Sequence, residues 1–190
     1  MRPRSTLTNT IIQENLKKTC QNAPELAIGE KDKFIILSDF HIGGGRRRDE
    51  FKKNAPLVIK ALKDWYLPRG FRLILNGDIE ELHRVSLRTV SNAWPQLYRL
   101  FLDFREGPGL YKIMGNHDYG AHQHWKTGRT SEEKEVNSHI LPSLKLSYKN
   151  NSLLVLHGHQ ASLYNSPFRH KVNKLALRYM AHPLHINNIK

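Results

Sequence analysis

Four short apolar runs in this chain each lead into Asp, Asn or His residues that stand close to glycine. The polar segments that follow them are Ser38-Asp39-Phe40-His41, Asn76-Gly77-Asp78, Gly115-Asn116-His117-Asp118 and His157-Gly158-His159. Short apolar runs bounded by glycine are typical of buried strands. Because the carboxyl ends of strands in an α/β sheet meet at one edge, we expect the four polar segments to gather there. Carboxylate and imidazole groups in one place predict a metal site with oxygen and nitrogen ligands.

The periodicity between these segments predicts an α/β layered domain. Strands are expected at residues 34–37, 71–75 and 110–114. A helix is expected over residues 54–66, with Val58, Leu62 and Trp65 on one face, and another over residues 93–104. Strands that alternate with helices favour a sheet covered by helices, with ligands at the carboxyl ends of the strands.

The two ends of the chain carry further patterns. Residues 1–30 are expected to form a helical extension, and residues 31–190 a single domain. Residues 144–148 and 153–156, joined across Asn150 and Asn151, predict an antiparallel hairpin that adds a second sheet or an edge. A basic helix is expected over residues 167–181. It either packs against a part of the protein beyond this chain, or binds nucleic acid or an anionic membrane.

The composition favours an anionic partner without choosing among phosphate, nucleic acid and a membrane surface. The chain has 30 Lys and Arg residues against 17 Asp and Glu residues, a formal net charge of +13. Cys20 is the single cysteine, which excludes an internal disulfide and fits a reducing compartment. The sequence contains no apolar run of about 20 residues and no signal-peptide core after Met1, so a cytoplasmic protein without a transmembrane segment is expected.

The polar segments resemble, in order, the motifs of the calcineurin-like metallophosphoesterases. The resemblance covers roughly residues 33–160 and rests on Asp39-x-His41, Gly77-Asp78, Gly115-Asn116-His117-Asp118 and His157-Gly158. It implies a layered α-β-β-α sandwich and hydrolysis of a phosphomonoester, phosphodiester or pyrophosphate bond. Residues 77–82 resemble the branch that cleaves the pyrophosphate of nucleotide-linked lipid A precursors. The implied substrate is therefore a phosphorylated small molecule or a nucleotide-linked one.

The resemblance also implies a site with two divalent cations, which would be Mn²⁺, Fe or Zn²⁺. Asp39 and His41 would hold the first metal, Asn116 and His157 the second, and Asp78 would bridge both. Two such cations about 4 Å apart clamp a phosphoryl group and turn a bridging water into a hydroxide nucleophile near neutral pH.

The two residues that follow Asn116 have a different implied role. His117 would act on the substrate, as general acid or as phosphate-binding group, and Asp118 would orient its ring. Arg46, Arg47 and Arg48 follow the first metal segment and could bind a substrate phosphate. A solvated loop is an equally good interpretation of these arginines.

Three further histidines, His83, His122 and His124, could line the pocket, although an exposed or core-bonded histidine is the simpler interpretation for each.

One motif of the family is incomplete in this chain. The family has a Gly-His-x-His motif further along, whereas residues 158–161 match only its first half, so the resemblance assigns the metal to His157 and not to His159. The chain is therefore expected to be truncated at its C-terminus, with residues 160–190 a helical insertion or the truncated end. The alternatives left open are a catalytically impaired fragment and a non-catalytic protein that binds anions or nucleic acid. The oligomeric state is not predicted.

Overall fold

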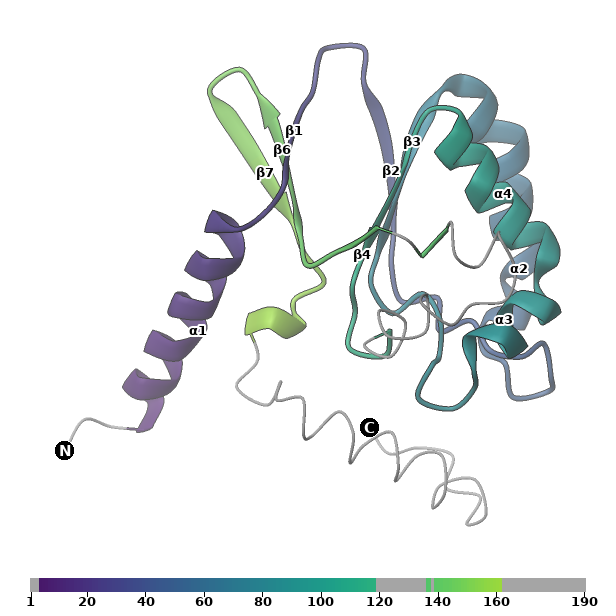
Figure 1. The fold of residues 1–190 in the computed structure, drawn as a ribbon, viewed down its shortest axis with the longest axis horizontal. Coiled ribbons are helices and arrows are strands. Elements are labelled where there is room, and N and C mark those ends of the chain that lie inside the picture. The colour runs from purple at the N-terminus through teal and green to yellow at the C-terminus, as the bar shows by residue number, and fades with distance from the viewer. Residues whose placement is uncertain (1–3, 119–135, 138, 162–190) are drawn as a thin grey trace.

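The structure is a computed structural model that describes residues 4–118, 136–137 and 139–161 (Figure 1). Its first sheet is parallel throughout and has the strand order β2-β3-β4-β5. The strands are β2 (Lys33–Leu37), β3 (Phe71–Asn76), β4 (Leu110–Ile113) and β5 (Ile140–Leu141). The three strands expected from the apolar runs are confirmed, and so is the α/β class.

A second, three-stranded sheet contains the expected hairpin. Its order is β1-β6-β7, formed by β1 (Glu25–Ala27), β6 (Leu144–Tyr148) and β7 (Asn151–Val155). Strands β6 and β7 are antiparallel, and Tyr148 pairs with Asn151, so the turn lies at Lys149 and Asn150, one residue earlier than expected. Strand β1 pairs parallel with β6. The expected N-terminal extension therefore contributes a strand to this sheet, which its short apolar segment did not indicate.

The helices expected over residues 54–66 and 93–104 are confirmed, whereas α3 was not expected. The α-helices are α1 (Arg4–Gln21), α2 (Ala55–Lys60), α3 (Leu87–Ala93) and α4 (Pro95–Glu106). Helix α2 is preceded by a 3₁₀ turn, η1 (Phe51–Lys53), and continues through a π-helical segment, η2 (Ala61–Tyr66), and a second 3₁₀ turn, η3 (Leu67–Arg69). A last 3₁₀ turn, η5 (His159–Ala161), follows β7. Among the described helices, none combines the length and apolar character needed to cross a bilayer.

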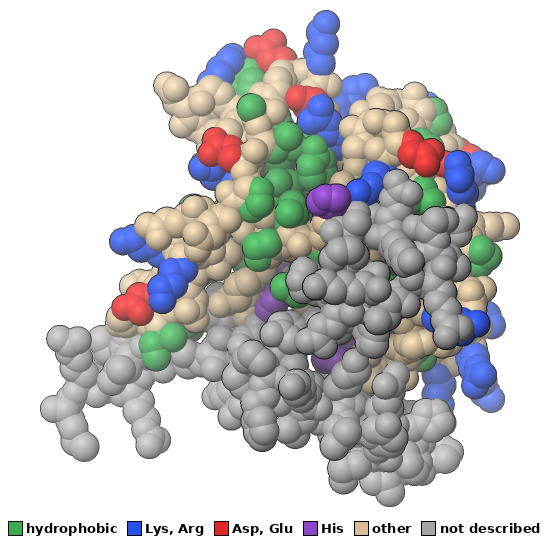
Figure 2. All heavy atoms as spheres, viewed as in Figure 1, with side chains coloured by type: hydrophobic (Ala, Val, Ile, Leu, Met, Phe, Trp, Pro, Cys, Tyr) green, Lys and Arg blue, Asp and Glu red, His purple; other side chains and the backbone are tan. Residues whose placement is uncertain are grey.

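The core has two parts because the side chains of β3 alternate between the two faces of the first sheet. Leu73 and Leu75 pack with the apolar residues of α4, such as Phe101, on one face. Ile74 packs with Leu144 and other residues of the second sheet on the opposite face. Figure 1 shows α2–α4 on one side of the first sheet and the second sheet on the other. Figure 2 shows hydrophobic side chains gathered between the two sheets on this face, with Lys and Arg toward its margins.

One predicted core residue is wrong. Trp65 was expected to share a buried face with Val58 and Leu62, and Leu62 is buried, but Trp65 is 56% exposed. The π-helical turn explains the difference, since the Leu67 N–H bonds to the Leu62 carbonyl and each turn of such a helix holds more residues than an α-turn. The phase of the helix therefore rotates after Leu62. The Trp65 ring instead lies 3.6 Å below the guanidinium of Arg69.

Candidate metal centre

Backbone pairing between β2 and β3 continues past the ends of the strands into the loops that carry the acidic and imidazole side chains. The Asp39 N–H donates to the Gly77 carbonyl at 3.1 Å, and the His41 N–H donates to the Asp78 carbonyl at 3.0 Å. Further along, Ile42 forms a parallel bridge with Glu80. The two loops are thus held in one register, which places Asp39, His41 and Asp78 at the same edge of the sheet.

The backbone at this edge is in an unusual conformation. Asp39, His41 and Asp78 have φ angles of 57°, 47° and 52°, in the left-handed region that disfavours side chains with a Cβ. Lys149 is the other non-glycine residue with positive φ in the described part of the chain. Backbone strain of this kind costs about 1–3 kcal/mol per residue and tends to cluster at functional sites. Its concentration at the expected metal ligands supports a site there.

Two glycines allow the loops to approach each other closely. A Cβ atom on Gly115 would lie 2.1 Å from the backbone nitrogen of Asp78. One on Gly77, whose φ is 79°, would lie 2.5 Å from the His157 ring. A side chain at Gly115 would push its loop away from Asp78, and one at Gly77 would push its loop away from His157. The motif glycines are therefore required by contact between loops as well as by turn geometry.

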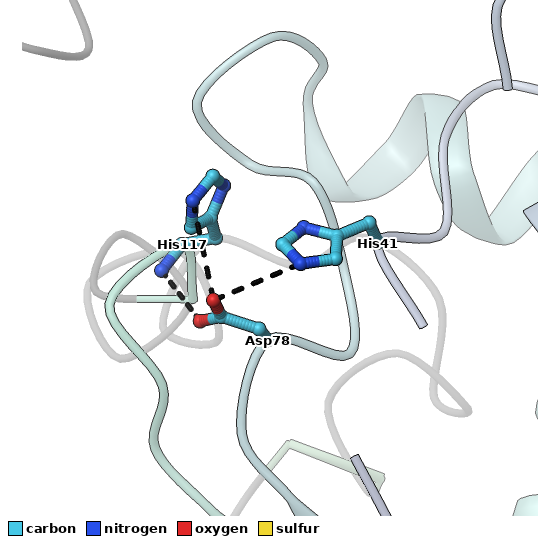
Figure 3. A group of neighbouring side chains, drawn as sticks. All are labelled: His41, Asp78 and His117. Atoms are coloured by element: carbon cyan, nitrogen blue, oxygen red, sulfur yellow. Dashed lines mark hydrogen bonds and ion pairs between the residues drawn. The ribbon is translucent and has the colours of Figure 1, made fainter. Parts of the chain in front are cut away.

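The Asp78 carboxylate is the centre of the cluster. Its Oδ2 atom lies 3.9 Å from His41 Nε2, 3.9 Å from His117 Nε2 and 3.4 Å from His157 Nε2. Its Oδ1 atom accepts the His117 backbone N–H at 2.8 Å. Figure 3 shows the rings of His41 and His117, from two different loops, on either side of this carboxylate. The Oδ1 atom of Asp39, whose side chain is 58% exposed, lies 3.9 Å from His41 Nε2, so the cluster is open to solvent on that side.

These side chains form two groups that could hold a metal ion, and Asp78 belongs to both. One group is His41, Asp78 and His117, and the other is Asp39, Asp78 and His157. Within each group the possible ligand atoms lie within 4.8 Å of one another. Imidazole nitrogens and carboxylate oxygens are the donors that Zn²⁺, Mn²⁺ and Fe prefer. The donor set therefore fits a divalent cation, with Asp78 as the shared ligand.

No family model, curated protein or solved structure matches the chain. The assignment of the site therefore rests on the geometry of the described residues.

The grouping differs in detail from the one that the motifs imply. His41 and Asp39 were expected at one metal and His157 at the other, whereas the structure groups Asp39 with His157 and brings His117 beside His41. Asn116, the remaining expected ligand, lies half-buried in the loop that carries His117. The structure thus brings four of the expected ligands together and adds His117 to their neighbourhood.

His157 is oriented by its own backbone contact. Its Nδ1 lies 2.9 Å from the carbonyl oxygen of Asn76, so Nδ1 carries the proton and donates it. The Nε2 atom is then directed at Asp78, as in metal-bound histidines whose second nitrogen donates to a carbonyl.

Glu81, and not Asp118, is the carboxylate that contacts the His117 ring. Asp118 is buried, and its carboxylate accepts the backbone N–H groups of Ile79, Glu80 and Gly115 at 3.1–3.3 Å. Glu81 lies 2.9 Å from His117 Nδ1 with one oxygen and 3.3 Å from His41 Nδ1 with the other. Glu81, and not Asp118, is therefore the carboxylate placed beside the His117 ring. The sequence signal for it is the Glu80-Glu81 pair that follows Asp78 on the same loop.

Hydrogen bonds shift the pKa values of Asp78, Glu81 and His41, whereas burial shifts that of Asp118. Burial alone would raise the pKa of Asp78, but the bonds from His157 and from the His117 N–H outweigh burial and lower it. In Glu81, likewise, the bonds from His117 and His41 outweigh burial, and the pKa is lowered. The bond to Glu81 raises the pKa of His41. Burial, followed by the nearby Glu80 charge, raises the pKa of Asp118 to about 7. Asp78 and Glu81 are therefore ionised, as carboxylates that face a cation must be.

The arginines expected to bind phosphate lie apart from the hydrogen bonds of the cluster. Arg46, Arg47 and Arg48 are exposed on the loop after the glycines, and among the described residues no hydrogen bond or ion pair joins them to Asp78 or its neighbours. The buried Asp49 holds this loop by accepting the Gly45 N–H at 2.7 Å.

The predicted helix over residues 167–181, together with His122 and His124, lies outside the described residues. The same holds for the expected insertion or truncated end beyond residue 161.

In metal-free protein, the free energy of unfolding is expected to fall as the pH rises from about 6.5 through about 9. The bond to Asp78 raises the pKa of His157 from 6.5 to about 9. The folded state therefore holds this proton more tightly, so the stabilisation is complete below pH 6.5 and is lost as the pH passes through the folded-state pKa. The loss is at most about 3 kcal/mol. Urea unfolding in a chelator at both ends of this range measures it. His157→Gln should lose this pH dependence, and an equal dependence in both proteins would contradict the ion pair.

Proposed function

We propose that this chain is a metal-dependent phosphoesterase of the calcineurin-like metallophosphoesterase family. The observation that supports this most is the convergence of His41, His117 and His157 on the single carboxylate of Asp78, with all four residues in the order in which the family motifs occur. The two packed sheets, with α2–α4 against the first one, are compatible with the layered α-β-β-α sandwich of that family. The proposed reaction is hydrolysis of a phosphomonoester, phosphodiester or pyrophosphate bond.

The proposed ligands are divided between two divalent cations, Mn²⁺, Fe or Zn²⁺. By the order of the motifs, Asp39 and His41 would hold one, Asn116 and His157 would hold the other, and Asp78 would be shared. When bound, the pair supplies a water of lowered pKa and electrostatic stabilisation of the phosphoryl oxygens.

The protein's own contribution is orientation. The positive-φ backbone and the paired loops hold Asp39, His41 and Asp78 in place before any ligand binds.

His117 acts on the substrate in this proposal. Its Nδ1 is held by the ionised Glu81, which leaves Nε2 on the side of Asp78 where the reacting phosphate would lie. From there, Nε2 donates a proton to the leaving oxygen or a hydrogen bond to a phosphate oxygen. The three exposed arginines that follow the first metal loop would bind a phosphorylated small-molecule or nucleotide-linked substrate, because guanidinium groups match phosphate oxygens.

His117→Ala is expected to slow aryl-phosphate hydrolysis by about a hundredfold or more while leaving the bound metal nearly unchanged. The reason is that the substitution removes the group that acts on the substrate but none of the proposed ligands. Metal content per chain and turnover are measured on the same preparation. His139→Ala is the matched control, since His139 is exposed and bonded to Arg105.

Loss of metal in His117→Ala would instead make His117 a ligand, in line with its grouping with His41 and Asp78. The non-catalytic alternative is supported by the net charge of +13. It would be favoured if the protein bound nucleic acid in a salt-sensitive way and hydrolysed no phosphate ester with any of the metals.

A further inference from the structure

One buried histidine beside the candidate metal centre has no part in the proposed reaction. His83 is 5% exposed, and its ring centroid lies 4.4 Å from that of His117. The backbone places it there because the Arg84 and Val85 N–H groups both bond to the Glu81 carbonyl, which closes a tight turn over residues 81–85. Leu82, inside this turn, is packed into the core. The position of His83 relative to Glu81 is therefore held by both backbone and core.

Glu81, His83 and His117 together have the composition of a metal site. Each offers one ligand atom, and the three atoms lie within 4.8 Å of one another. A tetrahedral zinc ion with bonds of about 2.0–2.1 Å needs its ligand atoms about 3.3 Å apart, so modest side-chain rotation closes the site. Glu81 and His83 are both buried, which limits their other rotamers. Two imidazoles and a carboxylate with a fourth position open is an established ligand set for Zn²⁺.

We propose that Glu81, His83 and His117 form a third cation site, selective for Zn²⁺ over Mg²⁺ and Mn²⁺. The site uses none of the five side chains that the proposed function assigns to the two metals, so it can fill while they are occupied. Its selectivity follows from its two imidazole ligands, which bind Zn²⁺ more strongly than Mn²⁺, and from the reluctance of Mg²⁺ to exchange water for nitrogen ligands.

Occupancy of this site would inhibit the reaction. The cation takes the Glu81 carboxylate and the His117 ring, the two groups that the proposed function assigns to orienting and acting on the substrate. Excess zinc should therefore inhibit a Mn²⁺-loaded enzyme, and inhibition should require His83. This consequence rests on the proposed function, whereas binding of the third cation does not.

The test counts zinc ions per chain, by dialysis and elemental analysis, in protein already saturated with Mn²⁺. The wild-type protein is expected to bind one more zinc than His83→Gln, which keeps a polar side chain of similar size but lacks the imidazole. His83→Cys supplies a thiolate ligand and should restore that zinc. His139→Gln, which removes an exposed histidine, is the matched control and should bind as many zinc ions as the wild type.

A second measurement covers the case in which His83→Gln does not fold. Co²⁺ replaces zinc in the Mn²⁺-saturated protein, and the third site should give visible absorption of a tetrahedral ion, with a thiolate charge-transfer band added in His83→Cys. Equal zinc counts in wild type and His83→Gln, or no tetrahedral Co²⁺ signal in the wild type, would overturn the site.

The zinc counts separate this inference from the proposed function. If His83→Gln alone binds one zinc ion fewer than the wild type, and the wild type hydrolyses no phosphate ester, the third site is supported and the phosphoesterase is refuted. Hydrolysis that excess zinc does not inhibit, with equal zinc counts in all variants, would support the phosphoesterase and refute the third site.

Discussion

Asp78→Asn is expected to remove most of the bound metal and to lower aryl-phosphate hydrolysis by at least about a thousandfold. Asp78 is the residue that both candidate groups share, and its side chain is buried among three imidazoles. Asparagine keeps the size of the side chain and an oxygen that can accept the His117 N–H, but it lacks the charge and the second oxygen needed to bridge two cations. This one substitution should therefore remove the metal ions from both proposed metal positions. Metal content per chain and hydrolysis are measured together.

The control for Asp78→Asn is Asp64→Asn. Asp64 is an exposed carboxylate that pairs with Lys60 on the surface, so its loss should leave both metal content and turnover unchanged. A circular dichroism spectrum like that of the wild type would establish that Asp78→Asn is folded. Unchanged metal content in a folded Asp78→Asn protein would refute the bridging role.

Lys112→Met is expected to lower the free energy of unfolding by about 3–5 kcal/mol, which would be the largest effect on stability among these variants. Lys112 on β4 is 1% exposed, and its ammonium lies 2.6 Å from both carboxylate oxygens of Glu80 and from Asn137 Oδ1. Tyr98 donates a further bond to Glu80 at 2.9 Å. Methionine fills the space of the lysine stem but leaves the Glu80 charge buried without its cation, and an unpaired buried charge is costly.

Urea unfolding of matched variants tests this prediction. Lys60→Met removes an exposed lysine from a surface ion pair and should change the free energy of unfolding by no more than about 0.5 kcal/mol. The double variant Lys112→Met with Glu80→Gln removes both charges and should recover part of the loss. Equal effects of Lys112→Met and Lys60→Met would contradict the burial of the pair.

This ion pair also connects the core to the site. The backbone N–H of Glu80 donates to Asp118, and the next residue is Glu81, which orients His41 and His117. Lys112 therefore helps to fix the position of the loop that carries Glu80 and Glu81, and its removal should also weaken metal binding.

Several features could be predicted from the sequence because they depend on residues close together in the chain. Strands β2, β3 and β4 follow from apolar runs that stop at polar residues near glycine, and α4 from the helical spacing of residues such as Leu97 and Phe101. The meeting of Asp39, His41 and Asp78 at one edge follows from a general property of parallel sheets, which brings the ends of neighbouring strands together. None of this requires knowledge of which side chain contacts which.

The contacts that decide the chemistry depend on the packed structure. Glu81 reaches His41 across 40 positions of the chain and His117 across 36, and both contacts depend on the register in which the loops after β2, β3 and β4 pair. The sequence suits Asp118 equally well to orient His117. Its carboxylate is instead buried and accepts three backbone N–H groups, an arrangement that no local pattern indicates. His83 is placed beside His117 by the same packing. Local sequence predicts which side chains lie at the edge of the sheet. Only tertiary contacts decide how these side chains pair, since each pair joins residues that are far apart in the sequence.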